Sequence, residues 1–392
     1  MSENALRRLQ ALNAETEIWW DSSPLVWPNF VESYMAGLPE ADRAWFKKET
    51  DGMFLDAPVS EWAFKGCTTN PPLSWAVIQK RTDEWIDVIK EKRKSYTGKS
   101  QYGLFKEVYL ETVKRGAEKL LPLFEASDGK LGHISGQVDP NLLKDEAAMK
   151  EMADELAALS PNVMVKIPAS TSGIPVFRYL ASKGIATNAT TCFNVPQIMA
   201  VAHSVAEGNK EFKASGSKRK GWKAVITQMS GRLEDSAAFR GYINKMNMDI
   251  SPLELRVASE AVVKKTAALL SERDLPLKML QCSARKHVDF EGNVFYPHIE
   301  MFAGGPLIYT IPPTVIGDYL YHYRDREIVN GWNAAPNAAV MKKLLQVPYF
   351  VKSYEEDGYA VEQFDEITSL IENAAVFSAA TNDMIDFVGK YV

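Results

Sequence analysis

A single lysine lies inside the most apolar short run of the chain. Lys166 is the fourth residue of VMVKIP (163–168). A lysine is rarely buried unless it is paired or has a chemical role. Burial lowers the pKa of an amine, and a neutral amine can attack a ketone and form a Schiff base. The alternative is a lysine at the exit of a strand, with its ammonium group in solvent, and the run by itself does not decide between the two.

Polar side chains also follow or interrupt the other short apolar runs. Asp21 could accept or donate a proton, and Arg232 and Arg285 could bind an anion bidentately. Each has a structural alternative, because Asp21 could cap a loop, Asn70 could only form a turn before two prolines, and the arginines could form surface ion pairs. The other polar residues at these places are Thr68, Thr69, Gln137, Asp139, Asn188, Thr190, Thr191, Ser283, Tyr309 and Thr310. Polar groups this dense are costly to bury unpaired, so we expect them to converge on a site.

Eight short apolar runs alternate with longer amphipathic stretches, and this pattern predicts the elements that hold these residues. We interpret the runs 17–21, 65–69, 132–139, 163–168, 185–191, 223–230, 276–283 and 306–311 as strands. Amphipathic stretches such as 142–159, 175–183, 195–207 and 251–271 predict helices between them. Strands that alternate with helices form parallel sheets, and near-continuous apolar runs are typical of strands buried on both faces. Eight units predict an α/β fold, a closed (β/α)8 TIM barrel, with its active site at the carboxyl ends of the strands.

Three segments extend a minimal barrel, although we expect residues 1–392 to form a single domain. The segment 24–64, after the first strand, is rich in tryptophan, phenylalanine and acidic residues and is interpreted as an insertion. The polar, basic segment 208–222 is interpreted as an exposed, mobile loop. The segment 361–392 is predicted to be a helix that packs over the barrel, from the apolar periodicity at Ile367, Leu370, Ile371 and Ala374.

Five short motifs resemble those of the transaldolase family in their order and approximate spacing. They are TTNP (68–71), VKIP (165–168), NAT (188–190), SGR (230–232) and SAR (283–285). The resemblance runs from about Asp21 to about Ile311, which is most of the chain. It implies the same barrel fold and a Schiff-base enzyme that acts on a phosphorylated ketose.

The resemblance also implies a role for each candidate residue. Lys166 would form the Schiff base, and Asp21 would accept the hydroxyl proton as the carbon–carbon bond breaks. Thr190 would position the catalytic water, and Gln137 stands where the family has another catalytic side chain. The implied substrate-binding residues are Thr68 and Asn70 for the hydroxyls of a dihydroxyacetone unit, Arg232, Arg285 and Ser283 for the phosphate, and Asn188.

The chain departs from the family at two positions. Transaldolases proper carry glutamate at the position of Gln137, and glutamine can hydrogen-bond a water but cannot take its proton. The related aldolases that cleave fructose 6-phosphate also have glutamine there, together with a tyrosine on the sixth strand, where this chain has Met229. The water-assisted steps would then be slower by about 10²–10⁴-fold, unless Gln228, Ser230 or a residue of an inserted loop supplies the missing group.

These motifs leave three functional interpretations open. The first is a transaldolase of the pentose phosphate pathway, which passes a dihydroxyacetone unit from sedoheptulose 7-phosphate or fructose 6-phosphate to an aldose phosphate. The second is an aldolase that releases dihydroxyacetone, or a specialised relative that acts on an unusual sugar; Gln137 favours it and Met229 opposes it. The third is a sugar-phosphate-binding protein with a degraded site, which would trap no sugar on Lys166 with borohydride.

Composition limits the location and the partners of the protein. The 392 residues have the apolar and charged content of an ordinary soluble globular protein and a formal net charge of -5. We therefore expect no affinity for nucleic acid and no membrane association, since no apolar run is long enough to span a bilayer. Cys67, Cys192 and Cys282, without a CxxC pair, are interpreted as small buried hydrophobes and fit a reducing cytoplasm.

We accordingly expect a cytoplasmic protein whose partners are small sugar phosphates. The N-terminal stretch is polar and lacks the apolar core of a signal peptide. The five histidines show no metal-ligand spacing, so we expect no metal and no organic cofactor. These features do not fix the oligomeric state, and a homodimer is one alternative.

Overall fold

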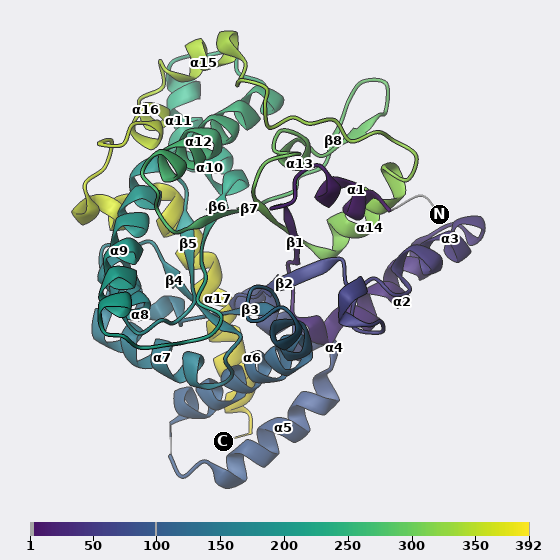
Figure 1. The fold of residues 1–392 in the computed structure, drawn as a ribbon, viewed down its shortest axis with the longest axis vertical. Helices are drawn as coiled ribbons and strands as arrows, with labels where there is room; N and C mark the ends of the chain where they lie inside the picture. The colour runs from purple at the N-terminus through teal and green to yellow at the C-terminus, as the bar shows by residue number, and fades with distance from the viewer. Residues whose placement is uncertain (1–3, 99, 392) are drawn as a thin grey trace.

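Eight parallel strands close into a barrel that helices surround (Figure 1). The structure is a computed structural model and describes residues 4–98 and 100–391, so residues 1–3, 99 and 392 of the predicted domain lie outside it. The strand order is β1-β10-β7-β6-β5-β4-β3-β2. The strands are β1 (Glu17–Trp20), β2 (Phe64–Thr68), β3 (His133–Gln137), β4 (Val163–Pro168), β5 (Thr187–Cys192), β6 (Ala224–Met229), β7 (Lys278–Cys282) and β10 (Ile308–Ile311). Each overlaps one predicted run, and the (β/α)8 TIM barrel is confirmed.

Local signals in the sequence mark where several helices begin. Asn70 caps α4 (Pro71–Lys80) by accepting a hydrogen bond from the main-chain N–H of Leu73 at 2.9 Å. A capping box of Ser251 and Glu254 starts α12 (Pro252–Glu272). The other helices are α1 (Ala5–Ala11), α2 (Trp27–Gly37), α3 (Glu40–Thr50), α5 (Thr82–Ser95), α6 (Gln101–Ala126), α7 (Glu146–Ala158), α8 (Gly173–Ser182), α9 (Val195–Ala214), α10 (Ser230–Asp235), α11 (Ala237–Lys245), α13 (Pro297–Glu300), α14 (Pro313–His322), α15 (Ala338–Leu344), α16 (Pro348–Tyr354) and α17 (Thr368–Gly389). Short 3₁₀ turns occur at η1 (Pro24–Val26), η2 (Val59–Glu61), η3 (Pro140–Leu142) and η4 (Val361–Glu366), and a small hairpin at β8 (His287–Val288) and β9 (Val294–Phe295).

The barrel interior and the helix layer form two apolar cores. The interior core consists of Trp19, Met164, Ala186, Val225, Leu280 and Ile308. A Cβ at Gly66 on β2 would lie 2.6 Å from the indole ring of Trp19, so only glycine fits beside it. The larger core lies between the strands and the surrounding helices. Because side chains fill the barrel, ligands can enter only at the ends of the strands.

Glu17 pairs with two lysines at the amino-terminal end of the barrel. Its carboxylate lies 2.7 Å from Lys223 Nζ and 2.9 Å from Lys278 Nζ. Burial by itself would raise the pKa of Glu17, but the two lysines outweigh burial and lower it. A carboxyl group with a lowered folded pKa contributes stability above its unfolded pKa, and that contribution is lost as the pH falls through the folded pKa.

Glu17→Gln is expected to lower the free energy of unfolding by about 3 kcal/mol at pH 7, because it leaves two partly buried ammonium groups without this carboxylate. The difference from the wild type should shrink as the pH falls below 4.5, the ordinary value for glutamate, since the wild-type carboxyl then also becomes neutral. Urea denaturation at both pH values measures this. The control is Glu207→Gln, whose pair with Arg178 is more than half exposed and should contribute less than about 0.5 kcal/mol; equal losses in the two variants would contradict the prediction.

Apart from Phe64, which begins β2, the segment 24–64 lies outside the barrel. It contains α2 and α3, whose aromatic residues pack together, with the rings of Tyr34 and Phe46 4.8 Å apart. Tyr34 on α2 donates a hydrogen bond to Asp318 on α14 at 2.8 Å, and the two helices are neighbours (Figure 1). All residues of this segment are described, and none of them lines the cavity at the carboxyl ends of the strands.

The prediction of a loop over 208–222 is wrong for its first part. Helix α9 continues to Ala214, because its polar half still packs on α8. Gly208 is so close to α8 that a Cβ there would lie 2.3 Å from the carbonyl oxygen of Arg178, and Arg178 Nε also donates to Glu211 at 2.7 Å. The exposed, non-helical part is therefore shorter than predicted, from Ser215 onward.

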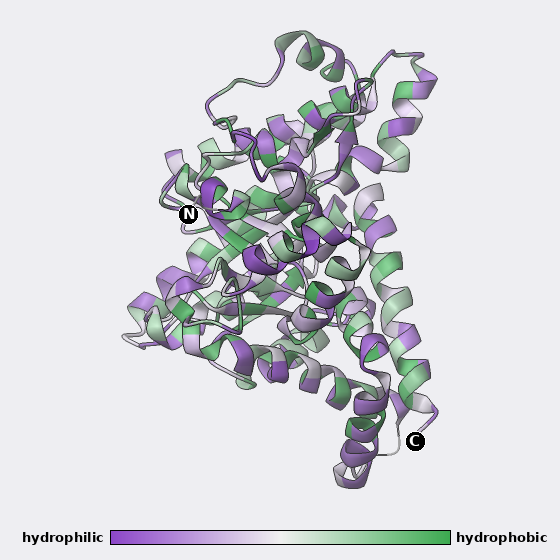
Figure 2. Cartoon of the chain, turned by 90° about the vertical axis from the view of Figure 1, so that its right-hand side faces the viewer, coloured by the Kyte–Doolittle hydropathy of each residue, from purple (hydrophilic) through white to green (hydrophobic). Residues whose placement is uncertain are grey.

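Helix α17 is the helix predicted in the C-terminal segment, of which Val392 lies outside the described residues. It contacts α4, α6 and the end of β5, and Figure 2 shows it along one side of the molecule, next to the C-terminus. The buried residues repeat at helical spacing, at Ser369, Leu370, Asn373, Phe377, Thr381, Met384 and Val388. Ile371, which we expected on the packed face, is 52% exposed. None of the described helices is long and apolar enough to cross a bilayer.

Candidate active site

A cavity of about 320 Å³ opens at the carboxyl ends of the strands. Its wall includes eight of the ten candidate residues: Asp21, Thr68, Asn70, Lys166, Thr190, Arg232, Ser283 and Arg285. They come from six different strands or from the residues that follow them. Only the closed barrel brings these distant parts of the sequence together.

Lys166 is buried in the floor of this cavity. It is 4% exposed, and its Nζ donates a hydrogen bond to the main-chain oxygen of Thr69 at 3.1 Å. The alternative of an ammonium group in solvent is therefore wrong. Burial lowers the pKa of Lys166, and the nearby carboxylate of Asp21 offsets part of this effect. A lowered pKa increases the fraction of neutral amine, which is the form that attacks a carbonyl group.

Asp21 faces the same cavity and receives a chain of hydroxyl hydrogen bonds. Thr68 Oγ1 donates to Asp21 Oδ1 at 2.5 Å, and Thr68 Oγ1 also contacts Thr310 Oγ1. Each hydroxyl has one proton, so Thr310 must donate to Thr68 when Thr68 donates to Asp21. Burial raises the pKa of Asp21, and the bond from Thr68 and the charge of Lys166 oppose the rise. A carboxyl group with a raised pKa can exchange protons closer to neutral pH.

Two arginines in the cavity wall give the cavity a positive charge. Arg232 follows β6, and its guanidinium group forms no ion pair with any carboxylate of the described residues. Arg285 follows β7, and it donates to the carbonyl oxygen of Gly231 at 3.0 Å and pairs with Asp235. Ser283 has a φ of 79°, which is uncommon for a residue other than glycine and turns the chain sharply between β7 and Arg285. This arrangement can bind an anion in the same cavity as the amine of Lys166.

The family comparison agrees with this geometry. The family model described as Transaldolase/Fructose-6-phosphate aldolase matches residues 53–366, well over half of the chain. The chain belongs to this family. Nine of the ten candidate residues of this transaldolase-family protein lie within the match, and Asp21 precedes it.

Several curated transaldolases are similar to part of the chain. The transaldolase of Thiobacillus denitrificans is 28% identical over 178 residues, which is 45% of this chain and 49% of that protein. The transaldolase of Mycolicibacterium smegmatis is 30% identical over 155 residues, or 38% of this chain and 40% of that protein. One from Helicobacter pylori is 33% identical over 138 residues, or 35% and 42%. The matched part thus spans about half or less of these relatives.

Gln137 and Asn188 are not part of the cavity wall. Asn188 lies one layer deeper than Thr190 on β5, where its side chain donates to Ser135 Oγ at 2.9 Å and accepts from Thr227 Oγ1 at 2.7 Å. Gln137 is buried beside Lys166 on β3, and its side-chain oxygen has no hydrogen-bond partner among the described residues. Both residues pair in register with Lys166, and whether such a side chain reaches the cavity or stays within the barrel could not be read from the sequence.

The cavity also contains residues to which the sequence assigned no role. The sequence does indicate that Thr310 faces the barrel interior, because side chains alternate along a strand and its neighbour Tyr309 then faces outward. Asn373 and Phe377 come from α17, and no local pattern shows that this helix reaches the site. The side-chain amide of Asn373 is fully buried and has no hydrogen-bond partner among the described residues.

Metal-binding groups are scattered rather than clustered. Across residues 4–98 and 100–391, no three His, Cys, Asp or Glu side chains lie close enough to hold a metal ion together. Cys282 does line the cavity, but burial, the largest cause, raises the pKa of its thiol to about 12. At neutral pH it is a neutral thiol and a weak ligand or nucleophile.

Proposed function

We propose that the protein is a transaldolase. It transfers a dihydroxyacetone unit from a ketose phosphate, such as sedoheptulose 7-phosphate or fructose 6-phosphate, to an aldose phosphate through a Schiff base on Lys166. The observation that carries the proposal is a desolvated lysine, a carboxyl group and two arginines around one cavity. Such a reaction belongs to carbohydrate metabolism in the pentose phosphate pathway, and we propose that it takes place in the cytoplasm.

The proposed first half-reaction uses Lys166 and Asp21. The neutral amine of Lys166 adds to the ketone carbon, and loss of water gives a protonated imine. Asp21 then accepts the proton of the hydroxyl group on the carbon β to the imine carbon, and the bond between the α and β carbons breaks. Its electron pair moves into the imine and leaves an enamine on Lys166, while the aldose phosphate departs. The short contact between Thr68 and Asp21 supports this role, because it orients the carboxylate.

The second half-reaction reverses these steps with a new aldehyde. The enamine carbon attacks the acceptor, the protonated Asp21 returns its proton to the new alkoxide, and hydrolysis of the imine frees the ketose. In both halves Arg232 and Arg285 bind the phosphate, which holds the reacting carbon at a fixed distance from Lys166. This sequence predicts ping-pong kinetics.

An aldolase that releases dihydroxyacetone is the second candidate, favoured by glutamine at position 137. Release requires protonation and hydrolysis of the enamine before an acceptor arrives. Thr190 Oγ1 has as its neighbour the sulfur of Met229, at 3.9 Å, where the family's aldolases have a tyrosine hydroxyl. A thioether cannot supply a proton to water or enamine, so we rank transfer above release.

The purified protein is expected to form glyceraldehyde 3-phosphate from fructose 6-phosphate continuously only when erythrose 4-phosphate is present. A coupled assay for the triose with and without the acceptor measures this. Sustained formation without acceptor would identify an aldolase. If neither condition gives triose and borohydride traps no sugar on Lys166 with a wider panel of ketoses, the proposal is wrong and a binding protein is favoured.

A further inference from the structure

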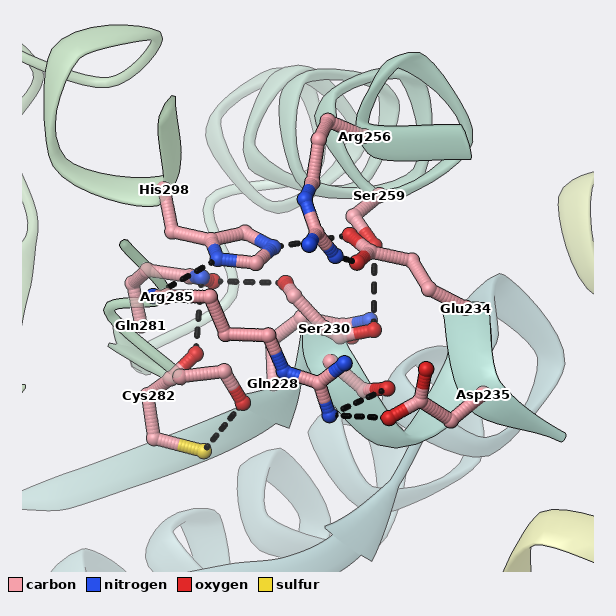
Figure 3. Close-up of polar contacts among 12 residues, drawn as sticks. Gln228, Ser230, Glu234, Asp235, Arg256, Ser259, Gln281, Cys282, Arg285 and His298 are labelled. Carbon is pink, nitrogen blue, oxygen red and sulfur yellow. Dashed lines mark hydrogen bonds and ion pairs between the residues drawn. The ribbon is translucent and has the colours of Figure 1, made fainter. Parts of the chain in front are cut away.

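A buried polar cluster lies beside Arg285, between α10, α12 and α13 (Figure 3). His298 Nε2 lies 2.7 Å from Glu234 Oε1, and the side chains of both residues are completely buried. The other carboxylate oxygen of Glu234 pairs with Arg256, which is 14% exposed. None of these three residues lines the cavity, and the proposed reaction uses none of them.

The hydrogen bonds of His298 fix the position of its proton. The main-chain N–H of Arg285 lies 3.3 Å from His298 Nδ1, and an N–H group can only donate. Nδ1 must therefore carry the lone pair, and the ring proton is on Nε2, which donates to Glu234. Burial, followed by the charges of Arg256 and Arg285, lowers the pKa of His298 well below its ordinary value, so the ring stays neutral.

Arg285 is thus connected to α10 through both its main chain and its side chain. Its main chain is bonded through His298 to Glu234, and its guanidinium group is bonded to the carbonyl oxygen of Gly231 and to Asp235. The approach to α10 is close, because a Cβ at Gly231 would lie 2.6 Å from Arg285 Nε.

The same short helix carries the second arginine of the cavity. Arg232 directly follows Gly231 and precedes Glu234 by two residues. The first residue of α10, Ser230, also donates to Gln281 on β7 at 3.0 Å. The spacing between the two guanidinium groups therefore depends on how α10 is held against the end of β7.

We propose that Glu234 and His298 are positioning residues that set the spacing between Arg232 and Arg285, so that both guanidinium groups reach one phosphate. The inference rests on the proposed function, which assigns both arginines to the phosphate of the sugar. A buried carboxylate costs desolvation free energy that its partners offset only in part, and apolar groups of similar volume often stabilise a fold as well or better. A positioning role therefore accounts for this buried cluster better than a contribution to stability does.

Three variants separate the two hydrogen bonds of the imidazole. His298→Leu removes both, and we expect the dissociation constant of inorganic phosphate, measured by calorimetry, and KM for fructose 6-phosphate to rise about tenfold, while kcat falls less. His298→Asn keeps an acceptor near the position of Nδ1 and should recover most of the phosphate affinity. Glu234→Gln keeps an acceptor for Nε2–H but removes the charge opposite Arg256, so its effect should lie between the other two.

His133→Leu is the matched control. His133 is also a fully buried histidine with one main-chain partner, the carbonyl oxygen of Gly221 at 2.8 Å, but it begins β3 at the opposite end of the barrel. It should lower stability without changing phosphate affinity. Circular dichroism checks that each variant is folded. If His298→Leu is not folded, the phosphate affinities of His298→Asn and Glu234→Gln, compared with that of the wild type, test the positioning role.

The outcomes for the cluster and for the proposed function are distinguishable. Unchanged phosphate affinity in the folded His298 and Glu234 variants, or a loss no larger than in His133→Leu, overturns the positioning role. Borohydride trapping of unphosphorylated dihydroxyacetone tests Lys166 alone. A wild-type protein that binds phosphate but traps no dihydroxyacetone refutes the Schiff base and leaves the positioning role standing, whereas one that traps it but binds no phosphate refutes the positioning role.

Discussion

A Lys166→Met variant is expected to lose sugar transfer and borohydride trapping together, with turnover lower by a factor on the order of 10⁴ or more. Methionine has a similar length and no amine, so it can form neither the imine nor the enamine. The variant should be at least as stable as the wild type, because it replaces a desolvated amine, with one hydrogen bond to Thr69, by an apolar side chain of similar volume. Mass spectrometry after borohydride treatment, together with a thermal melt, measures both effects.

Lys106→Met is the control for this experiment. Lys106 lies on α6 and pairs with Glu155 at 2.6 Å, outside the cavity, and its side chain is 24% exposed. The control should keep both the trapped adduct and the turnover. Lys166→Met protein that still carries the sugar mass on another lysine, at the wild-type rate, would show that the nucleophile is misassigned.

Asp21→Asn is expected to separate imine formation from cleavage. An amide cannot accept the hydroxyl proton, so turnover should fall by about 10²–10⁴-fold. The amine of Lys166 remains, and it loses a nearby negative charge that raises its pKa, so the neutral fraction of the amine should increase. Borohydride trapping of fructose 6-phosphate should therefore persist in a variant that is almost inactive.

The pH profile gives a second measure of Asp21. Burial raises the pKa of this carboxyl above its ordinary value. Cleavage needs the ionised form, so the wild-type rate should fall as the pH falls through that raised pKa, and this limb should be absent in Asp21→Asn. The control is Asp318→Asn, which removes a carboxylate bonded to Tyr34 outside the cavity and should leave the pH profile unchanged. Loss of trapping in Asp21→Asn, with the protein folded, would mean that Asp21 acts before the imine forms.

The sequence by itself determined the barrel and most of the candidate site. Strands buried on both faces must be apolar throughout, so the local composition indicates where they lie. A lysine within such an apolar run is therefore easily recognised. Candidate residues such as Asp21, Arg232 and Arg285 follow strands of one parallel barrel, which places them at the same end whatever the details of packing. The motif order gave the family, which the match over residues 53–366 confirms.

Only the tertiary structure decided which of these residues share the cavity and what surrounds them. The depth of Asn188 in the barrel, the extension of α9 to Ala214 along α8, and the arrival of Asn373 at the site all depend on contacts between residues far apart in the chain. The pairing of Glu234 with His298 likewise joins residues 64 positions apart, and neither residue is unusual in its local sequence. Local patterns report the period and burial of one element, whereas packing between elements depends on the shapes of all of them at once, and no short stretch of sequence contains that information.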